Sequence, residues 1–137
     1  MSLVASYREL LAYQKSYRLV LAVYEATRTF PAEERYGLCS QMRRSAVSIP
    51  SNIAEGFMRG TREYTHFLRV ALGSAAELDT QLSLGKDLGY VGEEAFAKMQ
   101  SELEEILKLL RTYINKMASK SNEAREDPAT YAQTIND

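Results

Sequence analysis

The sequence predicts an all-α protein, an antiparallel up-down-up-down four-helix bundle, on three observations. Four segments repeat apolar residues every three or four positions, the spacing of one helical face. Proline, glycine and paired acidic residues separate these segments, as expected at helix ends. The chain of 137 residues is also long enough to bury one hydrophobic core. Helices of this kind joined by short loops pack as a bundle in a single domain.

The first helix is expected to end at Phe30-Pro31. Alternating spacings of three and four place one set of residues on a single stripe: Leu10, Tyr13, Tyr17, Val20, Tyr24 and Thr27. Leu19, Leu21 and Val23 lie off this stripe and widen the apolar face. Two interpretations of these extra residues stay open. They either broaden the core stripe or become buried between subunits.

The second helix is expected to begin at Pro31, where a missing N–H costs little, and to run to Gly60. Glu33 and Glu34 follow in the first turn, where the helix dipole favours negative charge. The apolar seam of this helix consists of Met42, Ala46, Ile49 and Ile53. Pro50 interrupts the backbone hydrogen bonds and should bend the helix. The bend either follows a curved core or sets the angle at which neighbouring subunits dock.

Two further helices complete the bundle. Thr61 is expected to cap the third helix, which ends near Gly89 and Gly92. Its stripe consists of Tyr64, Leu68, Ala71, Ala75, Leu78 and Leu82. The fourth helix keeps an a/d heptad of Phe96, Met99, Leu103, Ile106, Leu110, Tyr113 and Met117. The polar composition after it predicts a tail, so residues 1–118 form the bundle and residues 119–137 the tail.

A polar seam runs beside the apolar seam of the second helix. A hairpin that turns at Gly60 and Thr61 brings Arg44 level with Glu77, and Ser48 level with Gly73. The same geometry pairs Gln41 with Gln81, Asn52 with Arg69, and Glu55 with His66. An ion pair of Arg44 with Glu77 would satisfy two charges that are costly to bury alone. The structural polar seam is therefore expected to contain Gln41, Arg44, Ser48, Asn52, Glu55 and Glu77.

The charges limit the classes of partner. The chain carries 17 Lys and Arg against 18 Asp and Glu, so it lacks the overall positive charge of a typical nucleic-acid-binding protein. A local patch at one end of the predicted hairpin is still a candidate for binding RNA or DNA. It consists of Arg59, Arg62, His66 and Arg69. The alternative interpretation is a solvated face whose charge is partly offset by Glu55 and Glu63.

Catalysis and metal binding are not expected. The only cysteine, Cys39, and the only histidine, His66, lie at opposite ends of the predicted hairpin, so they form no nucleophile–base pair. A di-metal bundle needs two Glu-x-x-His motifs, and Glu63-x-x-His66 is a single instance. We therefore expect a protein with no enzyme activity and no cofactor. Without an apolar run of membrane-spanning length or a signal peptide, we expect a cytoplasmic location and no membrane partner.

The run LCSQMRRSAVSIPSNIAEGFMRG, with FPAEERYGL before it and EYTHFLRVALGSAAELDTQLSLGKDLGY after it, resembles the four-helix bundle family of 23S rRNA intervening-sequence proteins. The matching positions are Phe30, Pro31, Glu34, Tyr36, Leu38, Gln41, Arg43, Arg44, Ser48, Ile49, Asn52, Ile53, Ala54, Glu55, Gly56, Gly73, Ser74, Glu77 and Leu78. Ser45 departs from the pattern, because alanine is usual there.

The resemblance implies an up-and-down bundle that closes into a ring, a homopentamer of unestablished biochemical role. Two hypotheses about function follow. The first is a non-enzymatic homo-oligomeric scaffold that interacts with protein partners. The alternative is an RNA- or DNA-binding protein whose basic patch is repeated around the oligomer.

Overall fold

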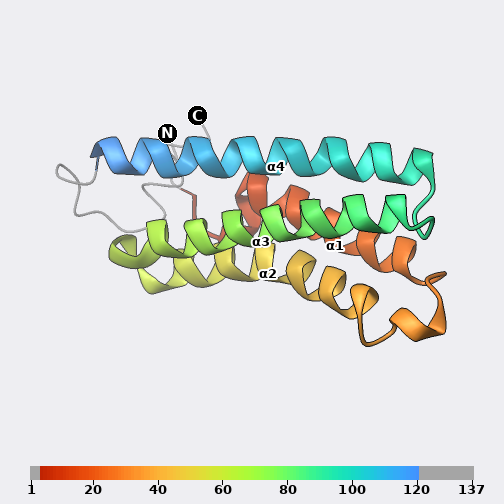
Figure 1. Cartoon of the computed structure of the whole chain (residues 1–137). Coiled ribbons are helices and arrows are strands. Elements are labelled where there is room, and N and C mark those ends of the chain that lie inside the picture. Colours follow the sequence, from red (N-terminus) through yellow and green to blue (C-terminus); the bar gives the residue numbers. More distant parts are fainter. Residues whose placement is uncertain (1–3, 121–137) are drawn as a thin grey trace.

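The computed structural model describes residues 4–120, which form four α-helices, two short 3-10 turns and no strand (Figure 1). The turns are η1 (Tyr7–Glu9) and η2 (Ala32–Glu34), and the helices are α1 (Leu11–Thr27), α2 (Leu38–Arg59), α3 (Thr61–Asp87) and α4 (Glu93–Lys120). Each helix packs against the next, and α1 packs against α4. The all-α prediction is confirmed. Ser119 and Lys120 belong to α4, and the rest of the predicted tail lies outside the described residues.

Three helices turn the predicted faces to the core. The predicted seam of α2 and the predicted stripe of α3 are buried along their whole lengths. On α4 every heptad residue from Met99 to Met117 is buried, and Phe96 packs against the core from its edge. The sequence pattern is decisive here because each helix has only one face on which apolar residues recur without interruption.

The first helix turns only part of the predicted stripe inward. Its buried residues are Ala12, Ser16, Leu19, Val23 and Thr27. Tyr17 and Tyr24, which the sequence analysis places on the core stripe, are 50% and 41% exposed. The prediction is wrong for these two tyrosines, whereas Leu10 and Thr27 of the same stripe are buried. Both faces of α1 are apolar, and periodicity does not rank them. The face with small side chains at Ala12 and Ser16 fits the crowded interior, which two more tyrosine rings would overpack.

The second helix begins at Leu38 and not at Pro31. Residues 32–34 form the separate turn η2, and the backbone of Gly37 then changes direction. The Glu34 carboxylate accepts a hydrogen bond from the Leu38 amide at 3.0 Å, which satisfies one of the free N–H groups at the start of α2. A Cβ at Gly37 would lie 2.8 Å from the same carboxylate oxygen. Glycine therefore leaves room for this cap.

A single residue, Gly60, connects α2 to α3. Its φ of 114° lies in the region that favours glycine, and this conformation separates the two helices. The N-cap of α3 is Gly60 and not Thr61, and no side chain caps this end. Pro50 lies inside α2, which is helical on both sides of it. The α2–α3 pair packs along most of its length, so the turn at Gly60 sets which residues of the two helices meet.

Two tyrosines are buried in the core with different polar surroundings. The Tyr64 hydroxyl has no hydrogen-bond partner among residues 4–120, and burial raises the pKa of this side chain. Burial also raises the pKa of Tyr113, but the backbone of Ala12, at the start of α1, forms a hydrogen bond with its hydroxyl. The Tyr113 hydroxyl therefore satisfies a backbone amide that has no partner within its own helix. The Tyr64 hydroxyl is removed from water without gaining a hydrogen bond.

Replacing each tyrosine with phenylalanine should change stability in opposite directions. Tyr64→Phe is expected to raise the free energy of unfolding by up to about 1 kcal/mol, and Tyr113→Phe to lower it by a similar amount. Because the pKa of Tyr64 is raised in the folded protein, the stability that depends on its protonated hydroxyl is complete below about pH 10. This stability is lost as the pH rises further. Tyr64→Phe should therefore lessen alkaline destabilisation. Urea unfolding of both variants at pH 7 and pH 10.5 measures these changes. A loss of stability in Tyr64→Phe as large as that in Tyr113→Phe would contradict the prediction.

Candidate functional site

The predicted polar seam has a half-buried centre that links two helices. The hydroxyls of Ser48 on α2 and Ser74 on α3 lie 2.7 Å apart. Asn52 Nδ2 donates to Ser48 Oγ at 2.9 Å and to the Ser48 carbonyl at 2.8 Å. Ser48 thus meets Ser74, the neighbour of the expected Gly73. Gly73 itself is exposed, and nothing lies within 4 Å of where its Cβ would be.

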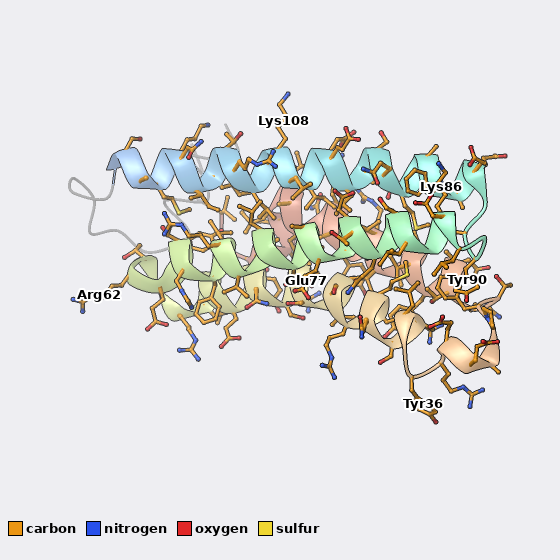
Figure 2. The ribbon with its side chains drawn as sticks, in the orientation of Figure 1. Tyr36, Arg62, Glu77, Lys86, Tyr90 and Lys108 are labelled. Carbon is orange, nitrogen blue, oxygen red and sulfur yellow. The ribbon has the colours of Figure 1, made fainter. Side chains whose placement is uncertain are left out.

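The outer members of the seam do not form the expected pairs. Arg44 and Glu77 are exposed, and Figure 2 shows Glu77 on α3. No ion pair within residues 4–120 includes either side chain. Gln41 is also exposed, and Glu55 pairs with Arg59 at 2.9 Å instead of meeting His66. Long charged side chains at a helix edge retain hydration that a buried pair would lose. The expected buried ion pair of Arg44 with Glu77 is therefore wrong for this chain.

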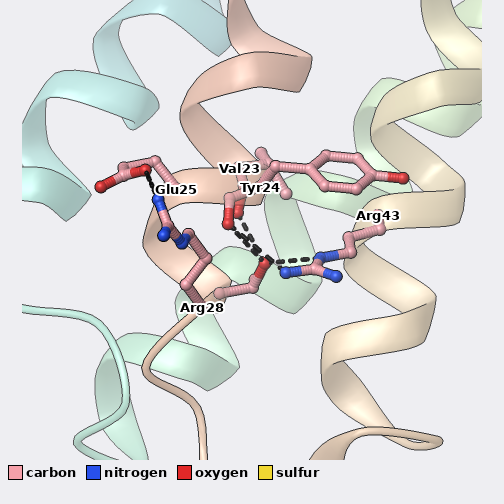
Figure 3. Close-up of polar contacts among 6 residues, drawn as sticks. Val23, Tyr24, Glu25, Arg28 and Arg43 are labelled. Carbon is pink, nitrogen blue, oxygen red and sulfur yellow. Dashed lines mark hydrogen bonds and ion pairs between the residues drawn. The ribbon is translucent and has the colours of Figure 1, made fainter.

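The Arg43 side chain on α2 forms hydrogen bonds with the C-terminal end of α1 (Figure 3). Its Nε donates to Thr27 Oγ1 at 2.8 Å, and its Nη2 donates to the Tyr24 carbonyl at 3.4 Å. The guanidinium carbon lies 4.5 Å from the centre of the Tyr24 ring. Thr27 Oγ1 donates in turn to the Val23 carbonyl at 2.8 Å. The positive charge of Arg43 also interacts favourably with the negative end of the α1 dipole.

The two neighbouring arginines should respond differently to substitution. Arg43→Ala is expected to lower the free energy of unfolding by about 2 kcal/mol, because it removes charged hydrogen bonds and a ring contact at the end of α1. Arg44→Ala is expected to change it by less than about 0.5 kcal/mol, as is usual for an exposed side chain. Chemical denaturation of both variants measures the difference. A larger loss in Arg44→Ala would contradict the structural assignment.

The predicted nucleic-acid patch is only partly free. Arg59 forms ion pairs with Glu55 at 2.9 Å and Glu63 at 3.1 Å, and lies over the Phe67 ring. Arg62, His66 and Arg69 are exposed along α3, and Figure 2 shows Arg62 projecting from the start of that helix. Arg62 and Arg69 take part in no ion pair in the described part of the chain. Three of the four expected side chains are therefore available to a ligand.

An exposed apolar surface, which we call the α1–α2 face, consists of Tyr17, Leu21 and Tyr24 on α1 and Val47 on α2. A groove of about 340 Å³ between the two helices continues this face, and Tyr13, Val20, Pro50 and Ala54 also line it. Several of these residues belong to the stripe that the sequence analysis assigns to the core. The apolar pattern itself was thus visible in the sequence, but its exposure was not.

Near the C-terminal end of α3, side-chain contacts link the turn η2 to the α3–α4 connection. Figure 2 shows Tyr90 beyond the C-terminal end of α3. Its hydroxyl donates to Glu34 Oε2 at 3.2 Å, while Glu34 Oε1 caps α2. The rings of Phe30 and Tyr90 lie 5.3 Å apart. Three positions quoted for the sequence resemblance, Phe30, Glu34 and the tyrosine of LGY, therefore meet here. Their geometry explains them as structural residues.

Residues 4–120 contain neither a cluster of metal-ligating side chains nor a helix of membrane-spanning character. No three side chains of His, Cys, Asp or Glu come together there as a metal site would require. Cys39 is buried, and its Sγ contacts the Thr27 carbonyl at 3.8 Å. None of the helices in this range combines the length and apolarity needed to cross a membrane.

Comparisons with known proteins agree with this geometry. The model of a family described as 23S rRNA-intervening sequence protein matches residues 8–112. A crystal structure of a protein of unknown function, from the S23 ribosomal protein family of Bacteroides thetaiotaomicron VPI-5482, is similar with a TM-score of 0.70 and 24% identity. That match covers 76% of this chain and 98% of the other, and at this identity it shows the fold alone. No curated protein matches the sequence.

Proposed function

The chain belongs to the 23S rRNA-intervening sequence protein family, and from this premise we propose that it is a non-enzymatic, self-associating interaction scaffold. The observation that carries the proposal is the α1–α2 face. Tyr17 and Leu21 are 50% and 59% exposed on one helix, beside Val47 on the next. Contiguous apolar surfaces of this kind are uncommon on monomers and are typical of protein–protein interfaces. A second copy of the chain is the proposed occupant.

The proposed assembly is a closed ring of up-down-up-down bundles, a homopentamer. A ring requires two different surfaces on each subunit, because its contacts run head to tail. The α1–α2 face is one of these two surfaces, and the other is a different part of the neighbouring subunit.

Light scattering coupled to size-exclusion chromatography tests self-association. The wild-type protein is expected to elute as one oligomer at micromolar concentration, and Leu21→Asp to dissociate it, because a carboxylate would be desolvated at the interface. Leu88→Asp is the matched control, since Leu88 is also exposed but lies at the C-cap of α3. A wild-type monomer, or an oligomer unaffected by Leu21→Asp, would refute the proposal.

Nucleic-acid binding through Arg59, Arg62, His66 and Arg69 is the alternative proposal. Arg59 of this patch is neutralised by two carboxylates, so the arginines of the patch that form no ion pair within residues 4–120 are Arg62 and Arg69. In a ring the pair would be repeated, which would multiply a weak electrostatic contact. Salt-dependent anisotropy with labelled RNA and DNA, lost in Arg62→Ala/Arg69→Ala, would favour this alternative. The expected lack of enzyme activity and the expected cytoplasmic location stay predictions.

A further inference from the structure

A second groove, about 460 Å³ in volume, lies where α1 ends and α2 begins. Its size is within the range typical of small-ligand sites. We call it the Arg–Tyr groove, and it is lined chiefly by Tyr24, Arg35, Tyr36, Arg43, Arg44 and Val47. Three of its lining residues carry positive charge and none carries negative charge. By contrast, the groove between α1 and α4 is lined by charges of both signs, and Lys15 and Glu105 form an ion pair within it.

The arginines of this groove keep donors available. Arg43 uses Nε and one Nη2 hydrogen on Thr27 and Tyr24, which leaves three of its five N–H groups. These bonds also fix its guanidinium in place. Arg35 and Arg44 are exposed, and no ion pair within the described residues includes them. Three positive charges therefore line one groove, and no carboxylate is among its lining residues.

The groove also has an aromatic edge. Tyr36 is 88% exposed, and Figure 2 shows it projecting away from the helices. Such a ring buries almost no surface against the core, so packing within this chain does not account for it. An exposed aromatic face is a platform on which a planar base can stack, and guanidinium groups nearby match the geometry of a phosphate. Both features occur within one groove.

We propose that the Arg–Tyr groove binds a nucleotide, with its phosphate held by Arg35, Arg43 and Arg44 and its base stacked on Tyr36. The nucleotide is either free or part of a single strand. An acidic peptide would satisfy the arginines but would leave the exposed ring without a partner. The site does not use the α3 patch. Every lining residue comes from one chain, so the site does not require self-association. Tyr24 and Val47 belong to both the groove and the α1–α2 face, whereas Arg35, Tyr36 and Arg44 lie outside that face.

Fluorescence anisotropy of the intact protein tests the site. The probes are fluorescein-labelled oligo(U) and oligo(dT) of 15 nucleotides, and a fluorescent ATP analogue represents a free nucleotide. Arg35→Ala/Arg44→Ala is expected to weaken binding at least tenfold at low salt, and to make it less salt-dependent. Tyr36→Ala should weaken it about fivefold or more, whereas Tyr36→Phe should retain it, because phenylalanine keeps the stacking face. Arg43 is left unchanged because it also holds α1.

Arg62→Ala/Arg69→Ala is the matched control, since it removes the same charge from α3 and should bind as the wild type does. Strand binding without binding of the ATP analogue identifies a strand as the ligand, and binding of both identifies a free nucleotide as sufficient. The proposal is overturned if the wild type binds neither the strands nor the ATP analogue at low salt, or if the α3 variant loses binding while the groove variants keep it. A peptide of residues 121–137 has four acidic residues and one basic residue. The proposal is also overturned if this peptide displaces the labelled strand as effectively as an unlabelled strand does.

Discussion

Replacing Gly56 with valine is expected to lower the free energy of unfolding by about 3 kcal/mol, because no side chain fits between α2 and α3 at this position. A Cβ at residue 56 would lie 2.7 Å from the Cβ of Phe67 and 3.4 Å from the Tyr64 carbonyl oxygen. Neither obstacle is the end of a flexible side chain, so the two helices would have to separate. Even Gly56→Ala should be destabilising, although alanine is the better helix former by roughly 1 kcal/mol.

Gly73→Ala is the matched control for this prediction. Gly73 also lies inside a helix, but its missing Cβ faces open space. With no clash to oppose the gain in helix propensity, the substitution should raise the free energy of unfolding by about 0.5–1 kcal/mol. Urea unfolding of the two alanine variants measures both effects. If both alanine variants were stabilising, the close approach of α2 and α3 at Gly56 would be incorrect.

Leu19→Ala is expected to lower the free energy of unfolding by about 3 kcal/mol, whereas Leu21→Ala should have little effect on the folding of a single chain. The two leucines are neighbours on one turn of α1, but Leu19 is fully buried and Leu21 is 59% exposed. Removing Leu19 leaves a cavity in the core between α1 and the other helices. Removing Leu21 shortens a side chain of the α1–α2 face.

Protein concentration separates the two effects. Subunit association stabilises folded chains more at higher concentration. The Leu21→Ala protein should therefore lose part of the concentration dependence of its thermal midpoint, and the Leu19→Ala protein should keep it. Thermal unfolding followed by circular dichroism over a hundredfold range of concentration measures this. Equal losses of stability at low concentration would mean that the assigned inner face of α1 is wrong.

The difference between α1 and the other helices shows what the sequence could predict. On α2, α3 and α4 one apolar stripe is bordered by polar residues, so the inner face follows from periodicity. On α1, Leu19 and Leu21 are equally apolar, and the tyrosines share the spacing of a core stripe. Burial there depends on which face the other three helices can approach most closely. That is a property of the assembled bundle and not of the segment.

The candidate site follows the same division. The height of Ser48 was predictable to within one residue, because Gly60 sets the register of two regular helices. The partners of Arg43 and Arg44 were not, because long side chains choose among several neighbours by small differences in hydration. The start of α2 was also missed. It depends on the Glu34 carboxylate reaching the Leu38 amide across Gly37, which helix-start rules based on Pro31 do not include.

The single-residue connection at Gly60 would allow the chain a second arrangement that keeps nearly the same contacts between helices. Apart from this one residue, helix runs from Leu38 to Asp87, and a continuous helix over the same residues would be a rod roughly 75 Å long at 1.5 Å per residue. Two such rods could each complete the other's bundle, exchanging α3 and α4 between chains while keeping almost every native contact. The backbone of one glycine therefore separates a self-contained fold from an intertwined pair.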